Sequence, residues 1–173
     1  MFSDPLKNLK AFEIKETDIV ADLGAGTGFY SILAAQIANK GKVYAVEISK
    51  DFLHTIINKV KENRLDNIEC LWGDVEKLGG TKIGDKIVDK VIASNVLFQI
   101  GDKEKFILEI KRILKDGGEV LFIDWSTLSN VMLRDLIVPK KQAQEMFEKN
   151  GFILEREIDA GAQNYGMIFR KTT

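Results

Sequence analysis

The sequence predicts an α/β fold in which a mostly parallel sheet of seven strands is covered by helices on both faces. Three observations lead to it: short apolar runs alternate with amphipathic segments, a glycine cluster follows the first apolar run, and six residues separate the last two runs. Strands that alternate with helical segments of about 10–15 residues form right-handed βαβ units. A six-residue connection is too short for a parallel crossover, so the last two strands are expected to be antiparallel. Residues 1–173 are expected to form a single domain.

The first half of the chain is expected to contain three strands and three helices. Asp4 and Pro5 are typical of a helix start, and apolar residues recur every three or four positions from Phe2 to Phe12. Short apolar or β-branched runs predict strands over residues 19–23, 43–48 and 67–72. Helical apolar spacing predicts helices over residues 30–38 and 52–60.

The second half repeats the alternation after a polar connection. Residues 73–86 contain Gly79, Gly80 and Gly84, so any helix there must be short. Residues 90–98 are predicted to form a strand that runs into a turn, with the strand ending at Asn95. Further strands are predicted over residues 119–125, 152–158 and 165–170, and helices over residues 106–114 and 139–149.

Composition narrows the classes of function. Lys and Arg number 25 against 26 Asp and Glu, so the chain has no overall positive field to attract nucleic acid. The one cysteine, Cys70, argues against an internal disulfide and a cysteine-rich zinc site, and no metal site is expected. No apolar run approaches the roughly 18 residues of a membrane span. The chain is therefore expected to be soluble, without a membrane partner, in a reducing cytoplasm.

The stretch DLGAGTG, Asp22 to Gly28, carries the strongest functional signal. It ends the first predicted strand and begins a helix, where glycine lets the backbone turn sharply and lets a ligand approach free helix amides. Dinucleotide sites usually have the spacing G-x-G-x-x-G/A, but here it is G-x-G-x-G, and Phe29 stands at the third glycine position. Asp22 disfavours a diphosphate and favours a ligand with a cation, such as S-adenosylmethionine (SAM). A tight turn that binds nothing is the alternative.

Two more acidic residues follow strands at the same edge of the predicted sheet. Glu47 ends the second strand, 19 residues after Gly28, where a carboxylate can accept hydrogen bonds from both ribose hydroxyls. Asp74 follows the third strand in the same relation, next to the crevice where an adenine would lie. A solvated carboxylate is the alternative for each, but three acidic residues beyond three successive strands favour one shared site.

These residues carry a resemblance to a known family. The stretches VADLGAGTGFYSILAA, VYAVEIS, CLWGDV, VIASNVLF and LKDGGEVLFIDW resemble, in order, the successive motifs of class I SAM-dependent methyltransferases. The chain is most similar to the small-molecule group that resembles ubiquinone/menaquinone-biosynthesis methyltransferases. The resemblance implies a Rossmann-like sheet of order 3-2-1-4-5-7-6 with strand 7 antiparallel, and SAM as the cofactor. Arsenite methyltransferases use several cysteines, whereas this chain has one.

The resemblance also implies roles for particular residues. The implied cofactor-binding residues are Asp22, Gly24, Ala25, Gly26, Gly28, Tyr30, Glu47, Ile48, Gly73, Asp74, Val75 and Asn95. Among them, the glycine backbone would approach the methionyl part of SAM, and Asp22 would help to place its amino end. Glu47 would hold the ribose. Asp74 with Val75 would recognise adenine.

On the acceptor side, Asn95 would face both the methionine moiety and the acceptor. Asn95 and Asp124 are the catalytic candidates, and Asp124 or Asp102 would act as a base if the acceptor must lose a proton. Tyr30 would either cover the cofactor or pack within its helix. After the fourth strand the chain reads SNVLF and not the (D/N)PP(Y/F) signature of enzymes that methylate exocyclic amines of nucleobases. A small-molecule acceptor is therefore expected, docked among residues 95, 98, 124 and 125, with nucleic acid disfavoured.

The predicted function is transfer of a methyl group from SAM to that small molecule by in-line displacement. The alternatives are a SAM-binding non-catalytic or regulatory subunit, a methyltransferase acting on RNA or protein, and, least favoured by the glycine spacing, a nicotinamide-dependent oxidoreductase. His54, the only histidine, is interpreted as a surface or packing residue, and Cys70 as a buried small apolar residue. Association into a homo-oligomer is left open.

Overall fold

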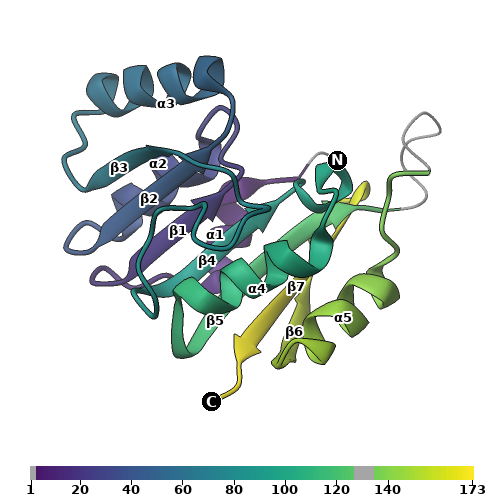
Figure 1. Ribbon diagram of the computed structural model, residues 1–173. Helices are drawn as coiled ribbons and strands as arrows, with labels where there is room; N and C mark the ends of the chain where they lie inside the picture. The colour runs from purple at the N-terminus through teal and green to yellow at the C-terminus, as the bar shows by residue number, and fades with distance from the viewer. Residues whose placement is uncertain (1–2, 127–134) are drawn as a thin grey trace.

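Seven strands form one sheet of order β3-β2-β1-β4-β5-β7-β6 (Figure 1). The structure is a computed structural model that describes residues 3–126 and 135–173. The strands are β1 (Ile19–Leu23), β2 (Lys42–Glu47), β3 (Ile68–Trp72), β4 (Val88–Ser94), β5 (Leu114–Trp125), β6 (Phe152–Ile158) and β7 (Asn164–Lys171). The pairs among β1 to β5 are all parallel, whereas β7 runs antiparallel to both β5 and β6. The predicted fold class and strand order are confirmed.

Helices cover both faces of this sheet. They are α1 (Pro5–Phe12), α2 (Phe29–Ile37), α3 (Lys50–Glu62), the 3-10 helix η1 (Leu97–Gln99), α4 (Lys103–Ile113) and α5 (Lys140–Lys149). Leu121 of β5 packs with the apolar residues of α1 and α2, whereas the next residue, Phe122, packs with those of α4 and α5. Successive residues of a strand point to opposite faces, so the chain has a core on each side of the sheet. Figure 1 shows α4 in front of the sheet and α1 behind it.

The strand order opens a crevice at the carboxyl ends of β1 and β4. From β1 the chain crosses through α2 to β2 on one side, and from β4 it crosses through α4 to β5 on the other side. The two crossovers therefore diverge between β1 and β4. In open α/β sheets, ligands bind at such a switch point.

The N-terminal helix is fastened to the sheet at its C-terminal end. Asp4 caps the start of α1, as expected. At the other end, the buried Lys90 donates to the Phe12 carbonyl at 2.9 Å, and Arg156 donates to the Ala11 carbonyl at 2.7 Å. Both cations satisfy helix carbonyls that have no partner within the helix. This attachment holds the start of α1 over the carboxyl edge of the sheet, where residues 3 and 5 reach the site described below.

The polar connection at residues 73–86 contains turns and no helix. It is held by Glu109 of α4, whose buried carboxylate accepts hydrogen bonds from the Gly79 amide at 2.8 Å and the Thr81 hydroxyl at 2.6 Å. Arg112 donates to the same carboxylate at 2.7 Å. These polar contacts with α4 hold the connection in place together with Val75 and Ile83, which are buried in the core beside α4.

Two strand boundaries differ from the expected ones. The fourth strand was expected to run into a turn within residues 90–98 and to end at Asn95. In the structure β4 ends one residue earlier, at Ser94, and Asn95 adopts a left-handed backbone with a φ of 54°. The fifth strand begins earlier than residue 119, because Leu114 already pairs with Val88 of β4. The left-handed turn at Asn95 directs the chain out of β4 and towards η1.

His54 and Cys70, for which no functional role was predicted, differ in their exposure to solvent. His54 is exposed on α3, as expected. Cys70 is half-buried in β3 and not fully buried, because β3 is an edge strand of the sheet. Within the described residues, no helix is long and apolar enough to cross a membrane, and no three His, Cys, Asp or Glu side chains gather as a metal site.

Candidate functional site

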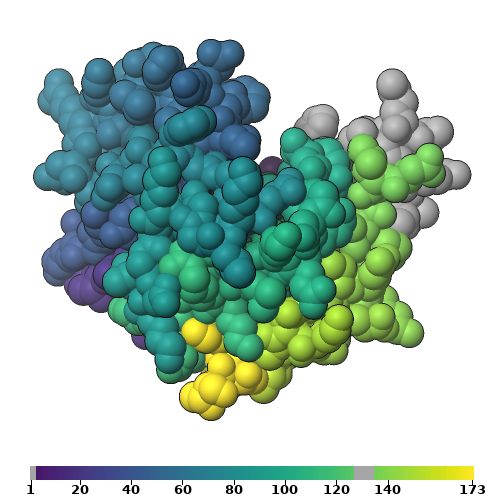
Figure 2. All heavy atoms as spheres, in the orientation of Figure 1, coloured from purple at the N-terminus to yellow at the C-terminus, as the bar shows by residue number. Residues whose placement is uncertain are grey.

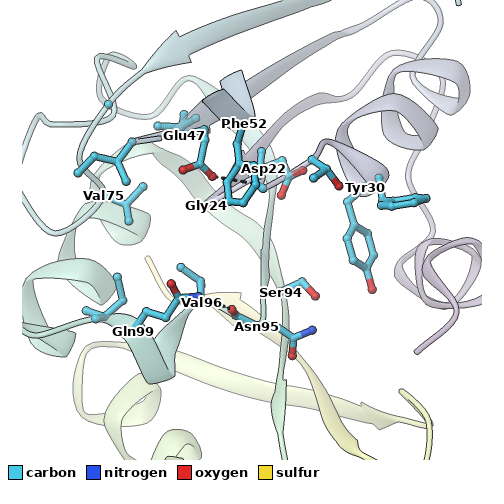
Figure 3. A pocket seen from close by; sticks show the side chains of 18 of the residues that line it. Asp22, Gly24, Tyr30, Glu47, Phe52, Val75, Ser94, Asn95, Val96 and Gln99 are labelled. Carbon is cyan, nitrogen blue, oxygen red and sulfur yellow. Dashed lines mark hydrogen bonds between the residues drawn. The ribbon is translucent and has the colours of Figure 1, made fainter. Parts of the chain in front are cut away.

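A cavity of about 510 Å³ lies at the carboxyl ends of β1, β2 and β4. Eleven of the twelve predicted cofactor-binding residues line it, and Gly28 does not. Figure 3 shows Glu47 and Val75 on one side of the cavity, Tyr30 on the other, and Ser94 and Asn95 across from Asp22. In the space-filling view a recess lies between the blue surface of α3 and the teal surface around η1 (Figure 2). Its volume is in the range of small-molecule and cofactor sites, about 300–1,000 Å³.

The glycine loop borders the cavity with three left-handed residues, with φ of 70° at Gly24, 56° at Gly26 and 82° at Gly28. Each glycine is needed for a different reason. A Cβ at Gly24 would come within 2.8 Å of Val96, and one at Gly28 would come within 3.0 Å of Ile56. A Cβ at Gly26 would meet no atom within 4 Å. Gly26 therefore leaves room for a ligand, whereas Gly28 admits α3.

Glu47 holds the loop in place from β2. Its Oε2 accepts a hydrogen bond from the Gly26 amide at 2.8 Å, and its Oε1 accepts one from the Ser49 amide at 2.8 Å. The residue is only 6% exposed, so it is not the solvated strand-end carboxylate of the alternative interpretation. A carboxylate has about four acceptor positions, so each oxygen can still accept a hydrogen bond from a ligand.

Asp22 places a buried carboxylate beneath the loop. It is 2% exposed, and its Oδ2 accepts a hydrogen bond from the Ser31 hydroxyl of α2 at 2.5 Å. Burial raises the pKa of Asp22 to about 6, and the nearby charge of Glu47 acts in the same direction. A cation in the cavity would favour the ionised form and lower this pKa. None of the described residues that line the cavity is Lys or Arg, so a cationic ligand would supply the positive charge that balances Asp22.

Asp74 and Val75 form the far end of the cavity. Asp74 accepts a hydrogen bond from the Glu76 amide at 3.0 Å and pairs with Lys77 at 2.9 Å. The hydrogen bond from Lys77 lowers the pKa of Asp74. Val75 and the ring of Phe52 add apolar surface to the same cavity. This end combines hydrogen-bond acceptors with apolar walls, a combination that suits a flat heteroaromatic ring.

Asn95 enters the cavity from the end of β4 in a strained conformation. Its φ is 54°, a region that non-glycine residues adopt rarely. The Asn95 amide donates to the Ile123 carbonyl at 2.8 Å, and its Oδ1 accepts a hydrogen bond from the side chain of Asn164 at 2.7 Å. Neighbouring strands therefore hold both the backbone and the side chain of Asn95. Such strain is typical of functional sites that the surrounding structure supports.

Asp124 does not line the cavity, and neither do Phe98, Asp102 or Trp125. Asp124 is 1% exposed, and its Oδ1 accepts the Trp125 amide at 2.8 Å. Burial raises the pKa of Asp124 to about 6, although the backbone amides of Leu97 and Phe98 lower it in part. Within the described residues, the other oxygen, Oδ2, has no hydrogen-bond partner. Of the four residues expected around the acceptor, only Asn95 therefore reaches the cavity.

The cavity also contains residues that sequence reasoning missed, among them Ser3, Pro5, Phe52, Ser94, Val96 and Gln99. Ser94 and Val96 flank the predicted Asn95, so the SNVLF stretch was a usable signal for them. Phe52 lies one turn into α3, where its apolar character was attributed to helix packing, yet it is 46% exposed. Ser3 had no local signal, since its position depends on how α1 packs.

Comparison with known proteins identifies the family. Residues 14–172 match a family model described as a methyltransferase domain. An arsenite methyltransferase from Halobacterium salinarum is 30% identical over 119 residues, which are 68% of this chain and 30% of that protein. A demethylmenaquinone methyltransferase from Listeria welshimeri is 30% identical over 121 residues, which are 69% of this chain and 50% of that protein. The chain thus spans half or less of the length of these curated relatives.

Solved structures agree with this result. A SAM-dependent methyltransferase from Aquifex aeolicus superposes with a TM-score of 0.88 at 26% identity, covering 98% of this chain and 90% of that one. The [4+2]-cyclase SpnF superposes with a TM-score of 0.83 at 17% identity, covering 97% of this chain and 80% of that one, which shows a shared fold only. The chain belongs to the methyltransferase domain family, and its cofactor is SAM.

Proposed function

We propose that this protein transfers a methyl group from SAM to a small-molecule acceptor by in-line displacement. The observation that carries the proposal is the buried carboxylate of Asp22 beside the open face of Gly26, in one cavity with Glu47 and Asn95. An uncompensated carboxylate favours a cationic ligand, and the missing Cβ leaves space for it. SAM meets both conditions.

The described residues fit each part of the cofactor. Asp22 would take the ammonium of the methionyl part, which would compensate its buried charge. Glu47 would accept hydrogen bonds from the ribose hydroxyls with the acceptor positions left by its two backbone contacts. Asp74 and Val75 would hold the adenine by its polar edge and its apolar face. Gly24 and Gly26 would let the backbone come close to the methionyl chain.

When bound, SAM supplies an activated methyl group, so the protein contributes mainly by positioning the two reactants. Asn95 stands at the cavity wall with its backbone fixed by Ile123 and its side chain fixed by Asn164, and would orient the acceptor. Asp124 lies outside the cavity, where it accepts the Trp125 amide, and would not contact the reactants directly. Among the described residues that line the cavity, the carboxylates are Asp22, Glu47, Asp74 and Glu76. The first three are assigned to the cofactor, so the arrangement favours an acceptor that needs no strong base.

Several observations support a small acceptor. The net charge is −1, and the cavity volume of about 510 Å³ must hold both the cofactor and the acceptor. The relatives named above are an arsenite methyltransferase and a demethylmenaquinone methyltransferase, which both indicate small molecules. Arsenite itself is less supported, because the one thiol is half-buried in β3 and burial raises the pKa of Cys70. We place the reaction in the cytoplasm.

The deciding experiment is transfer of a labelled methyl group from SAM into a fractionated cell extract. We expect label in the small-molecule fraction with the wild-type chain and none with Asp22→Asn. Label confined to RNA or protein would contradict the small-molecule assignment. SAM binding without any transfer would instead support the regulatory alternative, which the fold shared with a cyclase makes necessary to test.

A further inference from the structure

A polar cluster lies where α1 meets α2. It consists of Ser3, Asn8 and Tyr30. The Nδ2 of Asn8 donates to the Ser3 hydroxyl at 2.9 Å and to the Tyr30 hydroxyl at 2.8 Å. Asn8 is 1% exposed and does not line the cavity, whereas Ser3 and Tyr30 both do. A buried amide therefore connects two hydroxyl groups of the cavity wall.

The hydrogen-bond polarity of this cluster is determined by counting donors. The amide nitrogen of Asn8 has two hydrogens, and each hydroxyl accepts one of them. Asn8 Oδ1 is buried without a partner in the described part of the chain. The reverse orientation of the amide would leave two buried N–H groups unpaired in place of one carbonyl oxygen, and unpaired buried N–H groups are the rarer case. The arrangement with Nδ2 between the hydroxyls is therefore favoured.

Both hydroxyls keep their own hydrogen for another partner. Within residues 3–126 and 135–173, neither Ser3 nor Tyr30 donates a side-chain hydrogen bond to another protein group. Both residues line the cavity, so a ligand bound there can take the place of water as the partner of these hydrogens. Each hydroxyl already accepts a hydrogen bond, which leaves it poised to donate.

We propose that Asn8 holds Ser3 and Tyr30 as a donor pair that binds a carboxylate or carbonyl oxygen of a ligand in the cavity. The oxygen belongs either to the methionyl carboxylate of SAM or to the methyl acceptor. Asp22 lies near Tyr30 (Figure 3), and Ser31, the residue after Tyr30, donates to it. Asp22 would bind the ammonium group of an amino acid, and the neighbouring donor pair would bind its carboxylate. The proposal rests on SAM binding, as the proposed function does.

Two substitutions test the donor pair in different ways. Tyr30→Phe removes one donor and keeps the ring. Asn8→Asp keeps the shape of the side chain but accepts from both hydroxyls, which turns their hydrogens away from the cavity. Asn67→Asp is the matched control, because Asn67 also donates to two groups, the carbonyls of Ala35 and Ala38 at 2.9 and 2.8 Å, and lies outside the cavity.

Calorimetry with SAM and with decarboxylated SAM identifies the source of the oxygen. If it is the cofactor carboxylate, Tyr30→Phe and Asn8→Asp weaken SAM binding about tenfold or more and leave decarboxylated SAM unchanged. If the oxygen belongs to the acceptor, both variants keep the wild-type ratio of the affinity for SAM to the affinity for decarboxylated SAM. Benzoate, used as an oxygen-bearing probe, then binds the wild-type complex with S-adenosylhomocysteine and fails to bind the complexes of the variants.

Unchanged SAM affinity in both variants, together with benzoate binding that is unchanged or absent throughout, would overturn the proposal. If Asn8→Asp lowers the folded fraction more than Asn67→Asp does, the result for Tyr30→Phe alone tests the donor pair. These measurements do not depend on turnover. A chain that discriminates SAM from decarboxylated SAM through Tyr30 but transfers no methyl group would contradict the proposed function and leave the donor pair intact.

Discussion

The carboxyl edge of the sheet has two halves that are built differently. The cofactor half, at the ends of β1, β2 and β3, contains a glycine loop tied by Glu47 to backbone amides. The acceptor half, at the ends of β4 and β5, contains the strained Asn95 and the partly unpaired Asp124. Local sequence specifies the first half, whereas contacts between distant segments specify the second. The sequence motifs thus account for the proposed cofactor half, whereas the proposed acceptor half depends on tertiary packing.

The largest expected effect is at Gly26, in the cofactor half. Gly26→Val places a side chain in the space that a ligand needs and adds the cost of a left-handed β-branched residue, about 1–2 kcal/mol. We expect SAM affinity to fall by at least about a hundredfold, which corresponds to about 2.7 kcal/mol. Titration calorimetry with SAM measures the change.

Gly117→Val is the matched control for backbone strain. Gly117 has a φ of 75°, its Cβ would also meet nothing within 4 Å, and it lies outside the cavity. The control should lose similar stability and keep its affinity. Equal affinities in the two variants would show that the loop does not approach the cofactor.

The next effect in size concerns Glu47. Glu47→Ala removes the acceptor for ribose and also leaves the amides of Gly26 and Ser49 unpaired. We expect a loss of about 1.5–3 kcal/mol in cofactor binding and about 1–3 kcal/mol in the free energy of unfolding. Calorimetry and urea denaturation measure the two quantities. Glu69→Ala, which removes an exposed carboxylate paired with Lys42, should change neither much.

A smaller effect compares the two buried carboxylates across pH. Burial raises the pKa of both Asp22 and Asp124 to about 6, but only Asp22 lines the cavity. A cationic ligand requires ionised Asp22, so SAM affinity should rise about tenfold between pH 5 and pH 7.5. Asp22→Asn should bind weakly and without this pH dependence, whereas Asp124→Asn should retain it. A wild-type affinity that is flat across this range would contradict the role of Asp22.

Stability should show the opposite trend. A folded pKa of about 6 lies above the ordinary value of 3.8, so the folded state holds protons that the unfolded state has lost. The free energy of unfolding should therefore fall as pH rises from about 4 to about 6, by up to about 3 kcal/mol for each carboxylate. Above pH 6, bound SAM should restore the part of the free energy of unfolding that is lost through Asp22, but not the part that is lost through Asp124.

The acceptor half should respond in turnover more than in cofactor affinity. Asn95→Gly keeps the left-handed backbone but loses the hydrogen bond from Asn164. We expect methyl transfer to fall about tenfold, the effect of one lost positioning contact of about 1.4 kcal/mol, while SAM affinity stays near wild type. Trp125→Phe is the comparison, because Trp125 lies outside the cavity. A larger effect in Trp125→Phe would show that the acceptor binds beyond the described cavity.

The same contrast explains what sequence reasoning achieved. The order of elements, the antiparallel β7 and the position at the cavity of eleven of the twelve predicted cofactor-binding residues followed from periodicity, glycine spacing and the family resemblance. Gly28 does not line the cavity, and its glycine requirement comes from Ile56 of α3, a packing contact that no motif reports. Ser3 and Asn8 were missed because their place beside Tyr30 depends on how α1 docks.

Strand ends show the same limit. The stretch from Lys90 to Phe98 suggests a strand that runs into a turn, and the left-handed φ of Asn95 places that turn directly after Ser94. Asp124 was expected at the acceptor because it ends β5. Strand alternation instead places it on the face of Phe122, below η1 and away from the cavity.

The smallest expected effect is at Cys70, at the outer edge of the cofactor half. Cys70 is half-buried in β3, does not line the cavity, and pairs in register with Ala45 of β2. Burial raises the pKa of its thiol, so the reactive thiolate is disfavoured at neutral pH. Cys70→Ser should therefore keep SAM affinity and methyl transfer within about twofold and cost about 1 kcal/mol of stability or less. Parallel assays of transfer, binding and thermal unfolding measure it. Loss of transfer with binding and stability preserved would give the thiol a chemical role, and would make arsenite the first acceptor to test.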